Sequence, residues 1–281
     1  MAALLALGLK SMNVNYHFHC SCSFDSDAPL TEMCRAAEQA GLRRLCLTDH
    51  CDLLDEYGVP WDGWSWAAED EALREAKGRF PGLDLRRGVE LGQAILRPDA
   101  ARAVLSEPGI DFVLGSMHNA PSGQDYYWMK FTDRRQCLRL LEEYLTCLLK
   151  LSRTDFFDSL AHLTYPIRYM RFRDGVDVDF RPFDDLIREI LMELIHRGKA
   201  LEVNTSGYRE GLGEPLPQAY MLRLYRSLGG ELITIGTDAH QPCHIASGLD
   251  RGEALLEAIG FRYITLYRNR IPEQIKLEEV K

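Results

Sequence analysis

The chain has 281 residues, of which 46% are hydrophobic, and a formal net charge of −9 at pH 7. This length allows two domains, although α/β barrels of this size commonly fold as one. The negative charge argues against a groove lined with lysine and arginine for nucleic acid, but not against an anionic substrate, because bound divalent cations would reverse the local sign.

Short apolar runs alternate with longer amphipathic stretches from residue 13 onward, and no linker between them is long enough to separate domains. The longest helix is predicted from Leu138, Leu141, Leu145 and Leu148, whose spacing of three and four places them on one buried face. In chain order we expect strands at 13–18, 44–47, 83–90, 112–115, 157–161, 200–203 and 232–235. The helices expected between and after them cover 30–40, 64–78, 98–106, 133–151, 182–197, 217–228 and 251–259. A short strand at 263–266 and a charged tail would end the chain.

Seven strand–helix units followed by a terminal strand indicate an α/β fold with a closed or nearly closed parallel barrel. An open, doubly wound sheet is the alternative. The barrel is favoured because the candidate ligands described below follow the first five strands and the seventh, and only a ring brings those strand ends to one centre.

The ends of the chain give little sign of targeting. The apolar segment 1–9 is too short to span a bilayer and lacks the features of a signal peptide, so we expect no membrane partner. Residues 1–12 are predicted to be an N-terminal extension, with either Met1 or Met12 as the native start, and 13–281 a single barrel domain.

The eight cysteines contain no CxxC pair, which favours reduced, mostly buried thiols and a cytoplasmic location. Cys20, Cys22 and Cys51 stand close in sequence to candidate metal ligands. A metal contact from one of them is therefore left open.

Imidazoles and carboxylates gather where the predicted strands end, and six of the eight histidines lie in these segments. Metal ligands must converge on one point, as the carboxyl ends of barrel strands do. The segments are His17-Phe18-His19, Thr48-Asp49-His50, Gly88-Val89-Glu90, Gly115-Ser116-Met117-His118, Ala161-His162 and Gly236-Thr237-Asp238-Ala239-His240.

Each segment also has a plainer interpretation. Asp49 could cap a helix, although we favour it as a partner that orients an imidazole while His50 binds metal. Glu90 could pair with Arg86 or with Arg87, the latter being the weaker candidate because it faces the opposite side of the strand.

The other ligands are ambiguous when taken singly. His118 and His162 could each be ordinary core histidines, and Asp25, six residues after His19, could be a solvated loop residue. Taken together, nine ligands exceed what one or two ions need, since Zn²⁺ is usually satisfied by four. A cluster of three ions, with Glu90 bridging two of them, accounts for the number.

The order His-x-His, Thr-Asp-His, Glu, His, His and Gly-Thr-Asp-Ala-His resembles the PHP (polymerase and histidinol phosphatase) superfamily from about residue 13 to the tail. The resemblance is closest to the branch of monofunctional histidinol-phosphate phosphatases. It rests there on the segments 201–207 (LEVNTSG), 213–217 (GEPLP), 260–262 (GFR) and 267–272 (YRNRIP).

The resemblance implies a distorted (β/α)7 TIM-like barrel with three divalent transition-metal ions at the C-terminal rim of its strands. The ligands suit Zn, Fe and Mn alike. The implied ligands are His17, His19, Glu90 and Asp238 for the first ion, Glu90, His118 and His162 for the second, and Asp25, His50 and His240 for the third. Asp25 is assigned from its spacing alone.

The expected activity is the metal-dependent hydrolysis of L-histidinol phosphate in histidine biosynthesis, by in-line attack of a hydroxide between the ions that Glu90 holds. Asp238 and His240 are candidates for proton transfer, although the general acid is left open. Arg168, Arg209 and Ser206 follow strands and are expected to bind the phosphate.

Three alternatives are weighed against this activity. One is a phosphatase of the same superfamily that acts on a nucleotide or sugar phosphate, and another is a metal-binding module without catalysis. A nuclease is disfavoured by the acidic charge. The sequence does not set the oligomeric state.

Overall fold

The computed structural model describes residues 12–280, so the predicted extension lies outside the described residues except for Met12. Met12 is buried, and its backbone N–H donates to the Glu253 carboxylate at 2.9 Å. The domain boundary at residue 13 stays a prediction. None of the described helices is both long enough and apolar enough to span a bilayer.

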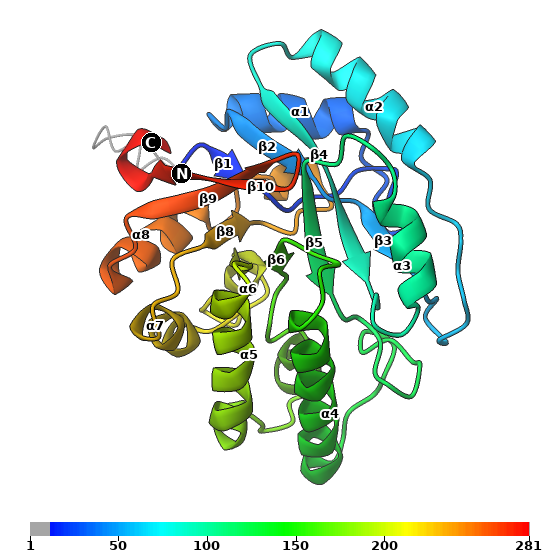
Figure 1. Cartoon of the computed structure of the whole chain (residues 1–281), viewed down its shortest axis with the longest axis vertical. Coiled ribbons are helices and arrows are strands. Elements are labelled where there is room, and N and C mark those ends of the chain that lie inside the picture. The colour runs from blue at the N-terminus through cyan, green and yellow to red at the C-terminus, as the bar shows by residue number, and fades with distance from the viewer. Residues whose placement is uncertain (1–11, 281) are drawn as a thin grey trace.

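Seven parallel strands form a nearly closed barrel surrounded by helices, as the alternating pattern predicts (Figure 1). The strands are β1 (Val14–Asn15), β2 (Arg44–Leu47), β4 (Asp84–Gly92), β5 (Phe112–Ser116), β6 (Ser159–Leu160), β7 (Ala200–Asn204) and β8 (Ile233–Gly236). They pair in that order. The ring closes where Tyr16 N donates to Ile235 O at 2.9 Å and Phe18 forms a parallel bridge with Ala239. The open-sheet alternative is therefore wrong.

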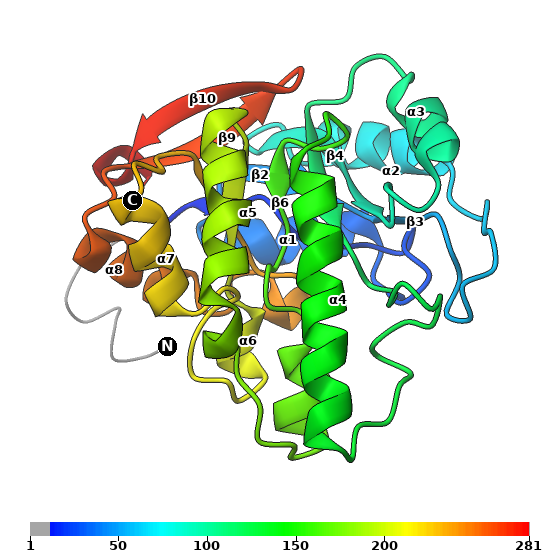
Figure 2. The same ribbon diagram turned by 60° about the horizontal axis from the view of Figure 1, so that its bottom comes forward.

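The helices lie on the outside of the strands, with α4 and α5 side by side along one flank (Figure 2). They are α1 (Leu30–Gln39), α2 (Trp66–Arg79), α3 (Pro98–Leu105), α4 (Arg134–Ser152), α5 (Asp184–His196), α6 (Ser206–Arg209), α7 (Ala219–Ser227) and α8 (Leu249–Ile259). Side-chain caps fix two of the starts: Ser65 Oγ accepts from Ala67 N, and the Asp133 carboxylate accepts from the two backbone N–H groups at 135 and 136. In α4, Leu141, Leu145 and Leu148 are buried as expected, whereas Leu138 is only half-buried.

Among the short helical segments that were not expected from the sequence, two bear on the site. One is α6, and the other is a π-helical stretch at Arg168–Arg173. Together they carry the three residues predicted to bind phosphate.

The sequence analysis also missed a short strand that contains His50. This strand, β3 (His50–Asp52), pairs in parallel with the C-terminal part of β4, and its register sets His50 opposite Glu90. The alternative of a helix cap at Asp49 is therefore wrong, because the chain continues as a strand.

The expected strand at 263–266 is present as β9 (Tyr263–Arg268), but the charged tail after it contains a further strand that was not expected. This strand, β10 (Ile271–Lys276), drawn in red in Figure 1, pairs antiparallel with β9. Both residues of the two-residue turn, Asn269 and Arg270, have positive φ, as a type I′ hairpin requires. β10 was missed because its residues are mostly exposed and so leave no apolar alternation.

The hairpin covers the N-terminal end of the barrel. The Tyr16 hydroxyl donates to the Tyr267 carbonyl and accepts from the Tyr267 N–H, both at 3.3 Å. The Phe112 ring packs against the rings of both tyrosines. The Arg270 guanidinium pairs with the buried Asp158 carboxylate at 3.0 Å. This end of the barrel is therefore closed by packing, and the opposite end is left for chemistry.

Candidate metal centre

The nine predicted ligands meet at the C-terminal end of the barrel. His17 and His19 follow β1, Asp25 lies in the loop before α1, His50 begins β3, Glu90 lies in β4, His118 follows β5, His162 follows β6, and Asp238 and His240 follow β8. Seven of them are at most 8% exposed, while the side chains of His240 and Asp25 are 25% and 37% exposed. Such burial is costly for so many polar groups unless they share partners or ions.

Glu90 is the centre of this group. Its Oε1 lies 2.8 Å from His162 Nε2 and 3.1 Å from His118 Nε2. Its Oε2 lies 3.1 Å from His50 Nδ1 and 3.3 Å from His17 Nε2. One carboxylate therefore reaches imidazoles from four different segments, as expected of a bridging ligand.

The salt-bridge alternative for Glu90 does not occur. Arg86 pairs with Asp84 at 2.5 Å, and Arg87 pairs with Asp70 at 2.6 Å. Both arginines are therefore paired with other carboxylates, which leaves the Glu90 carboxylate to the imidazoles.

Two further groups flank Glu90. His17 and His19 bring their Nε2 atoms to 3.1 Å from each other, and Asp238 Oδ1 lies 3.5 Å from His19 Nε2. On the solvent side, His240 Nε2 lies 3.0 Å from Asp25 Oδ2 and 3.4 Å from His50 Nε2. The spacing-based assignment of Asp25 thus places it beside the two imidazoles with which it was grouped.

The outer ring nitrogens are held by partners that the sequence analysis did not identify. Glu202 Oε1 lies 2.6 Å from His17 Nδ1, and its Oε2 accepts from His162 N at 2.7 Å. Asp52 Oδ1 lies 3.0 Å from His118 Nδ1. With the Nδ1 hydrogen given to a carboxylate, each ring turns its Nε2 lone pair toward the centre, as histidine ligands of metals do. The detectable signal was a charged residue within the buried strand β7.

The predicted role of Asp49 is carried out through Ser23. The Ser23 hydroxyl donates to Asp49 Oδ1 at 2.8 Å, lies 3.1 Å from His19 Nδ1, and accepts from His50 N at 2.9 Å. Asp49 therefore orients two segments of the centre without touching either imidazole directly.

Local backbone features explain why Gly-Thr-Asp-Ala-His has this form. A Cβ at Gly236 would lie 2.1 Å from the His17 Cβ and 2.8 Å from Glu202 Oε1, so only glycine lets these strands approach. Asp238 has φ of 54°, an uncommon left-handed conformation for a non-glycine residue, and such conformations cluster at functional sites.

Positively charged side chains in the centre stabilise the ionised forms of Glu90 and Asp238. Burial raises the pKa of Glu90, but the positive charges of His118, His50 and His17 outweigh it and hold that pKa well below its usual range. Burial likewise opposes ionisation of Asp238, and Arg168 and His17 reverse the effect, so its pKa is also lowered. Both carboxylates are therefore ionised at neutral pH.

The donor set fits divalent metal ions. Glu90 Oε2 is fully buried yet has no hydrogen-bond partner among the described residues. The Nε2 atoms of His17 and His19 face each other at 3.1 Å. A shared cation would stabilise this pair of nitrogen atoms more than they stabilise each other. Two candidate metal-binding clusters illustrate this. One is His17, His19 and Asp238, with Glu90 beside them, and the other is His50, Glu90 and His118.

The predicted phosphate-binding residues border the centre in different ways. An Nη atom of Arg168 donates to Asp238 Oδ2 at 2.8 Å and to the Ser206 hydroxyl, and its Nε lies 3.2 Å from Glu210. Arg209 donates to the carbonyls of Thr237 and Asp238 at 2.6 and 2.7 Å. Arg168 thus contacts the ligand Asp238 itself and Ser206 contacts Arg168, whereas Arg209 holds the backbone at Thr237 and Asp238.

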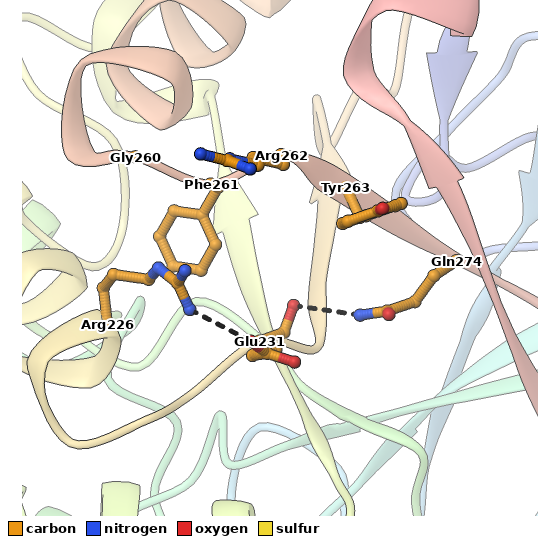
Figure 3. A pocket seen from close by; sticks show the side chains of 7 residues that line it. All are labelled: Arg226, Glu231, Gly260, Phe261, Arg262, Tyr263 and Gln274. Carbon is orange, nitrogen blue, oxygen red and sulfur yellow. Dashed lines mark hydrogen bonds and ion pairs between the residues drawn. The ribbon is translucent and has the colours of Figure 1, made fainter.

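A surface pocket of about 330 Å³ lies elsewhere, beside the β9–β10 hairpin (Figure 3). Its polar groups satisfy one another, since Arg226 pairs with Glu231 at 3.3 Å and Gln274 donates to the Glu231 carbonyl at 3.4 Å. Its lining contains no histidine or cysteine, so we place no chemistry there.

A parallel α/β barrel with clustered imidazoles and carboxylates at its C-terminal rim defines a class of metal-binding TIM-like barrels. The model of the PHP domain family matches residues 15–206, and the chain belongs to this family. The expected family and fold are thereby confirmed.

Relatives and solved structures agree with this assignment. A probable histidinol-phosphatase of Thermotoga maritima is 28% identical over 248 residues, which cover 86% of this chain and 91% of the relative. A histidinol-phosphatase of Lactococcus lactis is 24% identical over 235 residues, 81% of this chain and 84% of that one. The crystal structure of a histidinol phosphate phosphatase from Lactococcus lactis, in complex with Zn, L-histidinol and phosphate, superposes with a TM-score of 0.80 at 24% identity. It covers 93% of this chain and 99% of that chain, and the likeness shows a shared fold.

Proposed function

We propose that the protein is a phosphomonoesterase that hydrolyses L-histidinol phosphate to L-histidinol and phosphate with the help of three divalent transition-metal ions. The observation that carries the metal-dependent chemistry is the convergence of nine imidazole and carboxylate side chains, with Glu90 at their centre. The choice of substrate is supported by relatives that bear the name histidinol-phosphatase across most of this chain.

The ligands divide into three sets, two of which share Glu90. His17, His19 and Asp238, with Glu90, would hold one ion. His118 and His162 would share Glu90 for the second, and Asp25, His50 and His240 would hold the third. When bound, the ions would neutralise the phosphate dianion and supply a hydroxide nucleophile at neutral pH.

The chain's own residues would position the ester. Arg168 stays positively charged, and it presents its guanidinium to the same carboxylate, Asp238, that faces His17 and His19. A phosphate beside Asp238 would therefore meet a planar guanidinium and the Ser206 hydroxyl, which suits two-point recognition of phosphate oxygens. Arg209 would contribute from its remaining N–H groups while it braces the loop at 237–238.

Proton transfer is assigned to the two ligands nearest solvent and phosphate. Asp238 is held ionised by Arg168, so it is suited to accept a proton. His240 lies partly exposed, with its Nδ1 donating to the Asp238 carbonyl at 3.1 Å. This position allows it to exchange protons with water at the rim.

A substrate panel tests the proposal. Phosphate release is measured with L-histidinol phosphate, a nucleoside monophosphate, a sugar phosphate and an aryl phosphate, and L-histidinol is identified by chromatography. We expect the highest kcat/KM with L-histidinol phosphate. A higher value with the nucleotide or sugar phosphate would refute the substrate, and no release from any of the four would refute the function.

A further inference from the structure

A second group of potential ligands lies behind His19 and His50, and it is made of different atoms. The sulfur atoms of Cys20 and Cys22 and a carboxylate oxygen of Asp49 all lie within 4.8 Å of one another. Cys20 Sγ is 3.0 Å from Asp49 Oδ2. Cys20 and Asp49 are fully buried, and Cys22 is half-buried at the surface of the group.

Glu69 gives independent support for a cation near this group. This first-turn residue of α2 is 0% exposed, and neither carboxylate oxygen has a hydrogen-bond partner among the described residues. Buried carboxylates without partners are rare and call for an explanation such as an ion. The nearby arginine, Arg87, is already bonded to Asp70 and to the Pro108 carbonyl.

Glu69 is near enough to Asp49 and Cys22 to be affected by their charges. Burial, and then the negative charge of Asp49, raise its pKa well above the usual range, and the charge of Cys22 acts in the same direction. Ionised together, these groups would repel one another. A cation bound by Cys20, Cys22 and Asp49 would offset both this repulsion and the cost of burial.

We propose that Cys20, Cys22 and Asp49 form a separate site for one thiophilic divalent ion such as Zn²⁺ or Co²⁺, with the negative charge of Glu69 helping to balance the ion. Two sulfur atoms and one carboxylate oxygen would fill three of the four positions that zinc prefers, and a water molecule can take the fourth. Ligand atoms around one Zn²⁺ lie roughly 3.5 Å apart, given bond lengths of about 2.0–2.3 Å, so only small movements are needed. The site differs in kind from the centre around Glu90, whose predicted ligands are nitrogen and oxygen atoms alone.

Ser23 connects the two sites. It bonds Asp49 on one side and the His19 ring on the other. An ion held by Asp49 would therefore fix the loop from which Ser23 orients His19.

Cobalt spectroscopy tests this site directly. Metal-free protein, with all eight thiols reduced, is titrated with Co²⁺ while the near-ultraviolet thiolate-to-cobalt charge-transfer band is recorded. Only a sulfur-ligated ion gives this band, so the readout does not depend on phosphatase activity or on the centre around Glu90. We expect a band in the wild type that saturates with one ion per chain.

Two variants and one control complete the test. Cys22→Ser changes a half-buried ligand with little risk to folding, and it should lose most of the band at the same cobalt concentration. Glu69→Gln, which keeps the side-chain shape, should need more cobalt to reach the same intensity. Cys243→Ser alters an exposed thiol outside the group and should keep the full band. Circular dichroism checks that each variant is folded. Absence of the band in the wild type, or its retention in Cys22→Ser, would overturn the proposal.

Discussion

Replacing Glu202 with glutamine should weaken metal binding although Glu202 is not itself a predicted ligand. The carboxylate is 1% exposed and faces two donors at once, His17 Nδ1 at 2.6 Å and His162 N at 2.7 Å. Glutamine has only one acceptor oxygen, so its amide hydrogens must face one of these donors. Either the His17 ring or the His162 backbone N–H then loses its acceptor, and both belong to predicted ligands.

The magnitude follows from one lost bond. A hydrogen bond to a charged group contributes about 1.5–3 kcal/mol. At about 1.4 kcal/mol per factor of ten, its loss corresponds to a ten- to hundredfold weaker metal affinity, the range found when the outer partners of metal ligands are changed. The catalytic efficiency at limiting metal should fall by a similar factor.

Metal affinity is measured by competition with a chromophoric chelator, with Asp158→Asn as the matched control. Asp158 is also a buried carboxylate that accepts a backbone N–H and pairs with an arginine, but it lies at the closed end of the barrel. We expect Asp158→Asn to lower thermal stability and to leave metal affinity unchanged. Equal affinity in wild type and Glu202→Gln, or equal weakening in both variants, would refute the reasoning.

Substitutions at four further positions probe other parts of the centre. Glu90→Gln removes the shared charge and should reduce turnover by at least ~100-fold, and near-normal turnover would make Glu90 structural. Arg168→Ala should lower kcat/KM by about tenfold to a few hundredfold with metal content unchanged, and lysine should rescue only in part; unchanged kinetics would remove Arg168 from phosphate binding. Arg209→Ala should lower kcat/KM by a similar factor. A kcat/KM equal to that of the wild type would refute this expectation. Gly236→Ala places a Cβ against His17 and should lower both thermal stability and metal content, whereas a fully loaded, equally stable variant would contradict the close approach.

The sequence predicted the ligands because each of them except Asp25 is a polar residue at or just after the end of an apolar strand. Such positions mark one rim of a barrel whatever the detailed strand lengths are. The lengths were less predictable: only Val14–Asn15 and Ser159–Leu160 pair regularly in the strands expected at 13–18 and 157–161. Hydrophobic runs show which residues are buried, not where the ladder of hydrogen bonds breaks.

The partners of the ligands could not be predicted for a different reason. These partners are Glu202, Asp52 and Ser23, and each contacts a histidine from another segment of the barrel. Such contacts depend on strand order and on side-chain rotamers. Glu202 reaches His17 because β7 and β8 are neighbours and β8 in turn adjoins the segment after β1. Sequence periodicity gives the face of a strand but not the neighbour that this face meets.

The most direct test of the trinuclear proposal is the number of Mn²⁺ ions at which activity is complete. Mn²⁺ prefers carboxylate and imidazole ligands over thiolates, so it should leave Cys20 and Cys22 unbound. Metal-free protein is titrated with Mn²⁺, and phosphate release from L-histidinol phosphate is measured alongside the metal content of the desalted protein. We predict no release without metal and a plateau at three ions per chain. Full activity in the metal-free protein, or a plateau at one ion, would contradict the account.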